Sequence, residues 1–189
     1  MLTIKIKGDG LKQIEQALEA LSDEQGKRAI ARAMNEVGKT MRGKVIRATA
    51  KQVGASQAIV KKRGRITSKP ATAGSLSYVI SSQGGHMLLK DFGAKQNRKG
   101  VRAKPWGQGR TFGGAFMGAR PGLSTRKLGG NVFHRTGKER LPIQNMYGPA
   151  VPVEMVKGEA EATFRDYGEQ RLPKRILHHI TQTTKGTFS

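Results

Sequence analysis

The chain has 189 residues, which fits one domain of ordinary size or a compact domain with a long excursion. Apolar residues other than glycine make up 36% of the sequence, and the 25 glycines add no side chain to bury, so we expect a modest core. The formal net charge of +22 indicates a polyanionic or acidic partner, and the absence of cysteine excludes disulfides, thiol nucleophiles and Cys-ligated zinc.

The N-terminal part of the sequence predicts a strand followed by two helices. Residues 2–7 alternate apolar and polar side chains, as in a half-buried strand, and residues 11–21 repeat apolar residues at helical spacing. Ser22 and Gln25 form a capping-box pattern that begins a second helix, which we expect to run to about residue 52. Its apolar stripe consists of Ile30, Ala33, Met34, Val37, Met41 and Val45.

Residues 38–45, GKTMRGKV, nearly match the phosphate-binding loop, but Val45 replaces the hydroxyl that binds magnesium. The segment also lies within a helical pattern, whereas the motif requires a loop after a strand. We therefore predict no nucleotide site, and we interpret Gly38 and Gly43 as helix glycines that permit close packing or bending.

Short elements are expected in the next part of the chain. Ser56 is a candidate N-cap for a brief helix over residues 57–62. Residues 63–70 are expected to break regular structure, and residues 75–81 have the β-branched and aromatic composition of a strand.

Residues 90–130 contain ten glycines, ten Lys or Arg and one acid, Asp91. We therefore expect a long, basic, glycine-rich loop or arm, with a hairpin near residues 110–116. Strand patterns follow over residues 131–136 and 141–148, and Gly148-Pro149 predicts a turn.

The last part of the sequence predicts helices. Apolar residues recur every three or four positions from Val153 to Tyr167, Pro173 is expected to kink or interrupt the helix, and a last helix follows around Ile176 and Ile180. The fold class is α+β, with N-terminal amphipathic helices and a C-terminal helix packed on an antiparallel sheet. We expect a single domain over residues 1–189, with the basic arm at about 90–130 as an insertion.

The sequence predicts no metal, no cofactor and no enzymatic activity. The four histidines lack metal-ligand spacing, and adjacent His178 and His179 point about 100° apart on a helix. Five acids near the end of the chain are expected on a solvated face or in ion pairs between subunits: Glu154, Glu159, Glu161, Asp166 and Glu169. No apolar run resembles a signal peptide or spans a bilayer, so we expect a soluble protein with no membrane contact.

Basic residues carry the strongest functional signal. Residues 61–140 contain 18 basic and 2 acidic residues, a net charge of +16, against +1 for residues 141–189. Candidate contacts to a polyanion or a protein partner are Lys61, Lys62, Arg63, Arg65, Lys95, Arg98, Lys99, Arg102, Lys104, Trp106 and Arg110. Cations gain from counterion release at phosphates, and an indole stacks on exposed bases. The alternative interpretation has equal weight: the cations are solvated or contact a protein partner, and Trp106 anchors the loop to the core.

A family resemblance rests on five segments of the sequence. Two lie near the C-terminus, RLPIQNMYGPAVPVEM and RLPKRIL, and three lie earlier, LKQIEQALEAL, GKRAIARAMNEVGKTM and IVKKRGRI. The chain resembles the tailed-bacteriophage minor tail protein Z family, the lambda-type tail completion proteins. The resemblance spans both ends of the chain and rests on the order of the elements, because none of the strings is a catalytic signature.

This resemblance implies a structural virion protein, made in the host cytoplasm, that completes the tail at the head–tail junction. It implies an α+β fold and a homo-oligomeric ring of six copies. Expected neighbours are a tail terminator, tail tube or head–tail connector protein and the phage DNA end. The alternative is a dedicated basic nucleic-acid-binding protein, and a basic nuclease is a weaker alternative.

Overall fold

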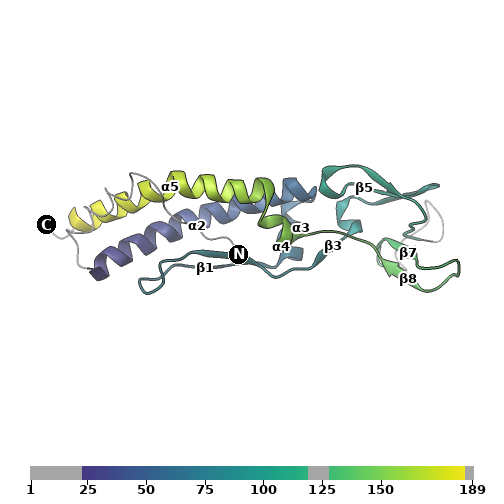
Figure 1. Cartoon of the computed structure of the whole chain (residues 1–189), viewed down its shortest axis with the longest axis horizontal. Helices are drawn as coiled ribbons and strands as arrows, with labels where there is room; N and C mark the ends of the chain where they lie inside the picture. Colours follow the sequence, from purple (N-terminus) through teal and green to yellow (C-terminus); the bar gives the residue numbers. More distant parts are fainter. Residues whose placement is uncertain (1–22, 119–127, 186–189) are drawn as a thin grey trace. The chain divides into compact units, whose positions relative to one another are not determined.

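The computed structural model describes residues 23–118 and 128–185, which form an α+β protein of helices and short antiparallel sheets (Figure 1). The described residues divide into two compact units. Unit 1 contains residues 23–48, 66–82 and 156–185, and unit 2 contains residues 49–65 and 83–155. The strand and helix expected within residues 2–21 lie outside the described part of the chain, as does Ser22.

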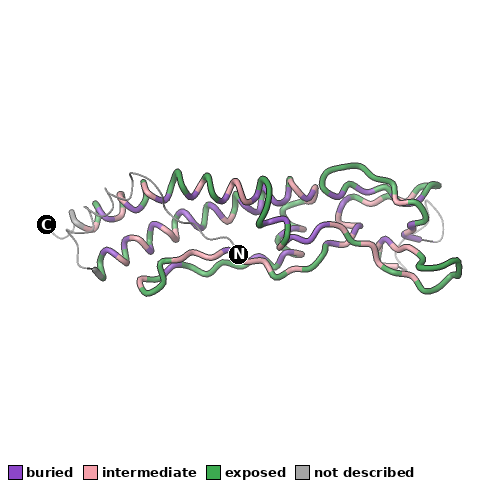
Figure 2. The backbone as a smooth tube through the Cα atoms, viewed as in Figure 1, coloured by how far each residue is buried: buried purple, intermediate pink, exposed green. Residues whose placement is uncertain are grey.

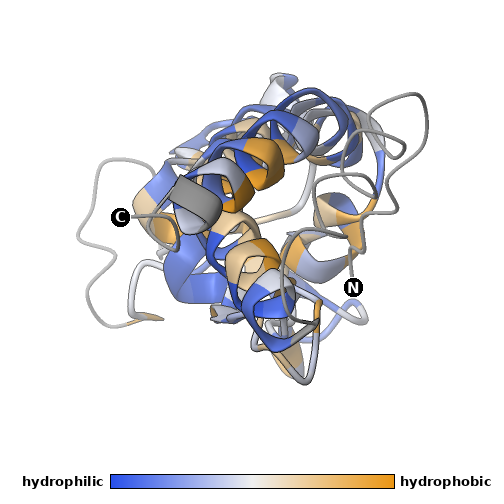
Figure 3. Ribbon diagram, turned by 90° about the vertical axis from the view of Figure 1, so that its left-hand side faces the viewer, coloured by the Kyte–Doolittle hydropathy of each residue, from blue (hydrophilic) through white to orange (hydrophobic). Residues whose placement is uncertain are grey.

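Unit 1 is built on two long helices that lie side by side, α2 (Asp23–Val53), whose last turn belongs to unit 2, and α5 (Gly158–Lys185) (Figure 1). The predicted stripe of α2 is confirmed: four of its six residues are buried and Ile30 and Met34 are half-buried. On α5, the buried side chains are Ala160, Phe164, Leu172, Ile176 and Ile180. Figure 2 shows buried positions recurring along both helices, and Figure 3 shows hydrophobic residues along them.

The other part of unit 1 is a hairpin of β1 (Ile66–Lys69) and β2 (Val79–Ser82), paired from Ile66 opposite Ser82 to Lys69 opposite Val79. Side chains of α2 bind this segment: Arg42 donates to the Ile66 carbonyl at 2.9 Å, and Asn35 exchanges two hydrogen bonds with the Ala71 backbone. The expectation of irregular structure over residues 63–70 is therefore wrong for β1. Pairing with β2 and burial of Ile66 outweigh the polar local sequence.

Pro173 does not divide the C-terminal helix, so the expected interruption is wrong. The helix α5 continues through Pro173 to Lys185. Proline removes one backbone donor and costs about 3 kcal/mol in a helix interior, but Leu172 and Ile176 on either side are buried and hold the two halves in one helix. The expected helix starting at Val153 is instead two elements, α4 (Val151–Met155) and α5, and Gly158 at the break has φ +60°.

In unit 2, α3 (Gln57–Gly64) begins as predicted, because the Ser56 hydroxyl accepts a hydrogen bond from the Ile59 amide at 3.3 Å. The strand β3 (His86–Leu88) pairs with β9 (Tyr147–Ala150). The turn predicted at Gly148-Pro149 is wrong, because both residues lie in β9. The register shifts between His86 and Leu88, and such an irregularity accommodates a proline that cannot donate to the ladder.

Residues 95–112 form a three-stranded antiparallel sheet rather than the predicted loop or arm. After the 3-10 turn η1 (Leu89–Phe92), the chain forms β4 (Lys95–Asn97), β5 (Gly100–Ala103) and β6 (Arg110–Phe112), with η2 (Pro105–Gly107) between the last two. Val101 and Ala103 are buried, and this burial with two ladders of backbone hydrogen bonds orders a glycine-rich segment. The hairpin expected near residues 110–116 is also wrong, because β6 pairs with β5 and Phe116 bridges Phe133.

The remaining pair in unit 2 is β7 (Phe133–Arg135) with β8 (Ile143–Asn145), which confirms two predicted strand segments. In the described residues, the strands form four small antiparallel sheets and not the one sheet that the sequence suggested. No helix within the described ranges is long and apolar enough to cross a membrane.

The two helix glycines of α2 provide a matched pair of substitutions. A Cβ at Gly38 lies 2.5 Å from the Tyr78 ring, whereas a Cβ at Gly43 meets nothing within 4 Å. We expect Gly38→Ala to destabilise the fold by about 1–2 kcal/mol, because the ring must move. Gly43→Ala is expected to stabilise it by up to about 1 kcal/mol through helix propensity. Urea unfolding of both variants checks this, and equal effects of the two substitutions contradict it.

Glu36 joins the two long helices through contacts that depend on pH. Its carboxylate binds Arg175 at 2.9 Å and His179 at 3.0 Å. The hydrogen bond from His179 is the main cause that lowers the pKa of the Glu36 carboxyl, and the charges of Arg175, His179 and His178 contribute. Because the pKa is lowered on folding, ionised Glu36 stabilises the folded state at pH values above the unfolded-state pKa of about 4.5. This stabilisation is lost as the pH falls through the folded-state pKa.

We expect Glu36→Gln to cost no more than about 1 kcal/mol at pH 7, because the site is exposed and screened. The difference in the free energy of unfolding between this variant and the unsubstituted protein should shrink as the pH falls below 4.5. Denaturant unfolding at a series of pH values measures it. A difference that stays constant down to the acid limit means that the ion pairs are not its source.

Candidate polyanion and partner contact surface

All eleven residues singled out from the sequence lie in unit 2. One group follows α3 and its C-terminal end: Lys61, Lys62, Arg63 and Arg65. The other group follows β4, β5, η2 and β6: Lys95, Arg98, Lys99, Arg102, Lys104, Trp106 and Arg110. Within these groups, every side chain except that of Arg63 is exposed.

The sheet β4–β6 presents cations on one face. Lys95 of β4 lies directly opposite Arg102 of β5, and both are exposed, whereas the neighbouring Val101 is buried. Successive residues of a strand point to opposite faces, so Lys95 and Arg102 share the solvent face. Favourable side-chain pairs across two strands stabilise a sheet by ~0.2–1 kcal/mol each, and like charges directly opposite each other destabilise it by a similar amount. This arrangement therefore favours a ligand that neutralises both charges.

The loop between β4 and β5 adds two more cations, Arg98 and Lys99. It is held in shape locally, because the Lys99 amide donates to Asn97 Oδ1 at 2.9 Å. Gly100 follows with φ +128°, and a Cβ there would collide with the Phe112 carbonyl oxygen of β6. Glycine is thus required for the close approach of the strands, and the basic tip is carried on an ordered hairpin.

Trp106 is fixed by a buried carboxylate that the sequence did not identify. Its indole Nε1–H donates to Glu154 Oε1 at 3.2 Å, and Gln52 Nε2 donates to Glu154 Oε2 at 2.8 Å and to the Glu154 carbonyl at 3.0 Å. Glu154 is 4% exposed, so the expectation of a solvated or intersubunit role is wrong for this residue. Of the two roles considered for Trp106, the contact supports the anchor, although the ring is 46% exposed.

Arg63 is also tied to the fold. Its guanidinium makes two hydrogen bonds with Asp91, at 2.7 and 3.2 Å, and the two side chains are 32% and 11% exposed. This two-point geometry is the strong form of the Arg–carboxylate pair. Arg63 therefore holds the end of α3 against η1, while Lys61, Lys62 and Arg65 remain exposed.

The described residues contain no cluster of three or more His, Asp or Glu side chains that could hold a metal ion. His178 and His179 contact each other edge to face at 5.5 Å, and His179 binds Glu36. The near-match GKTMRGKV lies within α2, so its backbone amides are not arranged as a phosphate-binding loop.

The family described as prophage minor tail protein Z matches residues 6–186. The chain is therefore a structural protein of the phage tail class. It belongs to the prophage minor tail protein Z family, which confirms the resemblance. Comparison with curated proteins and with solved structures gives no match.

The buried carboxylate allows a stability test. Glu154→Ala leaves the Gln52 amide and the Trp106 indole without their acceptor, and we expect a loss of about 2–4 kcal/mol in the free energy of unfolding. Glu139→Ala, an exposed acid in the same unit, serves as the control and should change stability by less than about 0.5 kcal/mol. Chemical denaturation measures both variants, and similar values for the two would mean that the network contributes nothing.

Proposed function

We propose that the protein completes the phage tail at the head–tail junction, as a ring of six copies and without enzymatic activity. Its exposed cations in unit 2 contact an acidic surface of a neighbouring protein, a tail terminator, tail tube or head–tail connector, or the phage DNA end. Membership of the minor tail protein Z family supports a role in the tail. The ring, its copy number and the position at the neck rest on the resemblance described above.

One observation carries the basic-contact part of this proposal. Lys95 and Arg102 face each other across β4 and β5 on the solvent face, with Arg98 and Lys99 at the hairpin tip. Solubility depends on the net charge of the chain and does not require that four cations lie on one hairpin. Their clustering therefore indicates a contact rather than a requirement for solubility. An anionic partner would relieve their repulsion and release counterions.

The test replaces Arg98, Lys99, Arg102 and Lys104 together with Gln. We expect the variant to fold normally, because exposed charges contribute little to stability, and the titre of infectious particles to fall at least about tenfold. The measurement is titre together with electron microscopy of head–tail joining. A matched control replaces four exposed cations of α2 and α5, Arg32, Lys39, Arg47 and Lys174, with Gln and should keep a normal titre.

Normal joining and normal infectivity of the hairpin variant would refute the basic-contact mechanism. Binding of the purified protein to a short DNA duplex separates the two kinds of partner. If DNA is the partner, the salt dependence of binding should become shallower in the hairpin variant by about 0.9 per lost phosphate contact. Sequence-independent DNA binding together with normal tail joining would favour the alternative, a dedicated nucleic-acid-binding protein.

A further inference from the structure

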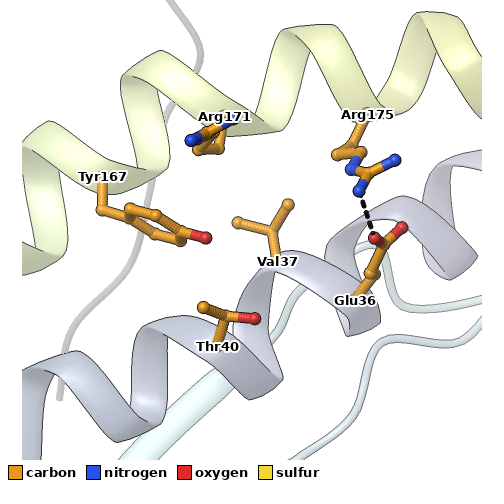
Figure 4. A pocket seen from close by; sticks show the side chains of 6 residues that line it. All are labelled: Glu36, Val37, Thr40, Tyr167, Arg171 and Arg175. Carbon is orange, nitrogen blue, oxygen red and sulfur yellow. Dashed lines mark ion pairs between the residues drawn. The ribbon is translucent and has the colours of Figure 1, made fainter.

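A pocket of about 230 Å³ lies between α2 and α5 in unit 1 (Figure 4). Its lining comes from Glu36, Val37 and Thr40 of α2 and from Tyr167, Arg171 and Arg175 of α5. All six residues belong to one compact unit, so the pocket is part of that unit's own fold.

The pocket offers hydrogen-bond donors that nothing within the described ranges uses. Arg171 is exposed and makes no ion pair or hydrogen bond there, and the hydroxyls of Thr40 and Tyr167 likewise bond to no described residue. The Lys44 ammonium lies 4.9 Å from the centre of the Tyr167 ring and adds positive charge beside the pocket. A guanidinium, two hydroxyls and a nearby ammonium form a binding set for an anion.

Glu36 is the acid in the pocket wall, and both of its oxygens are occupied. Arg175 binds Oε1 at 2.9 Å, shown by the dashed line in Figure 4, and His179 binds Oε2 at 3.0 Å. Because these contacts compensate the Glu36 charge, Arg171 and Lys44 leave the pocket with a net positive field.

We propose that this pocket binds a carboxylate side chain from a second copy of the chain. The planar guanidinium fork of Arg171 matches a carboxylate through two parallel hydrogen bonds. The Thr40 and Tyr167 hydroxyls would each supply one further donor to the same group.

The chain itself supplies a suitable carboxylate, Glu169. This residue is exposed on α5 and has no partner in the part of the chain that the structure describes. It precedes Arg171 by two positions, which places it about 200° away around the helix, so it cannot reach its own pocket. Asp166 lies three positions before Glu169 on the same flank, and its contact with Arg165 is long at 3.9 Å.

The flank of α5 that carries Glu161, Asp166 and Glu169 is net acidic, because Arg165 beside them is paired with Glu161 at 3.3 Å. This acidic flank and the basic flank at Arg171 lie on different sides of the helix. When one copy inserts its acidic flank into the pocket of the next, the two surfaces in contact are different, and such a heterologous contact builds a closed ring or an open filament. The inference does not depend on the basic surface of unit 2 or on the proposed function, although a ring requires a contact of this kind.

The test is the self-association of the purified full chain, measured by analytical ultracentrifugation over a concentration series. We expect Arg171→Glu and Glu169→Arg each to weaken association at least about tenfold, because each places like charges together. The double substitution should restore association, and so should an equal mixture of the two single variants, since opposite charges meet again in both cases. Lys174→Glu is the control: an exposed cation on the same helix that does not line the pocket.

Three outcomes would overturn the proposal. The unsubstituted protein stays monomeric at every concentration, or Lys174→Glu weakens association as much as Arg171→Glu, or Glu169→Arg has no effect while Arg171→Glu does. The last outcome assigns the pocket to a carboxylate from elsewhere. Particles that carry Arg171→Glu and remain fully infectious would count against this contact in the particle without affecting the basic-contact proposal, which concerns other residues.

Discussion

Acidic residues are scarce in this chain, 13 against 35 Lys and Arg, and the described fold depends on where they are placed. Asp91 binds Arg63, which lies 28 residues away in the sequence. Glu154 binds Trp106 and Gln52, which lie 48 and 102 residues away. Glu36 binds His179, which lies 143 residues away. Each of these carboxylates joins segments that are remote in the sequence, within one unit. They differ in strength, because Glu154 and Asp91 are shielded from water while Glu36 is exposed and screened.

Most cations are therefore left without a carboxylate, and the sheet β4–β6 shows how the fold tolerates them. The Lys95–Arg102 pair costs at most about 1 kcal/mol, which is small beside the ~5–15 kcal/mol stability of a typical domain. Buried Val101 and Ala103 on the other face, with the strand hydrogen bonds, offset that cost. The repulsion persists in the free protein, and an anion bound between the two cations would relieve it.

The sequence predicted elements whose information is local. The helix α2 ends within a residue of the expected position because its apolar stripe repeats over many turns, and the Ser56 cap depends on four consecutive residues, 56–59. The sheet over residues 95–112 was missed because its glycines and cations have loop composition, and only the cross-strand partners order them. The Gly158 break was missed because the apolar period continues across it from Val153.

The same distinction holds for the candidate surface. Its charge was evident from composition, but the commitment of Arg63 to Asp91 and of Trp106 to Glu154 depends on tertiary contacts that no spacing encodes. The sequence did contain one signal that Glu154 is buried: its carboxylate directly follows Val153, the first residue of an apolar helical repeat. Its burial becomes plausible only when α4 is recognised as separate from α5.

Self-association of a chain with a charge of +22 faces a general electrostatic constraint. Copies repel through their net charge, but salt screens this repulsion beyond about 8 Å at physiological ionic strength, so the charge close to the contact matters most. Residues 141–189 carry +1 and residues 61–140 carry +16. A contact between copies would therefore be least costly along α5, where the proposed contact brings Asp166 and Glu169 to cations of a neighbour, and most costly along β4–β6. The chain thus has one nearly neutral region, where contacts between copies would be least repulsive, and one strongly basic region, where an anionic partner would be attracted most strongly.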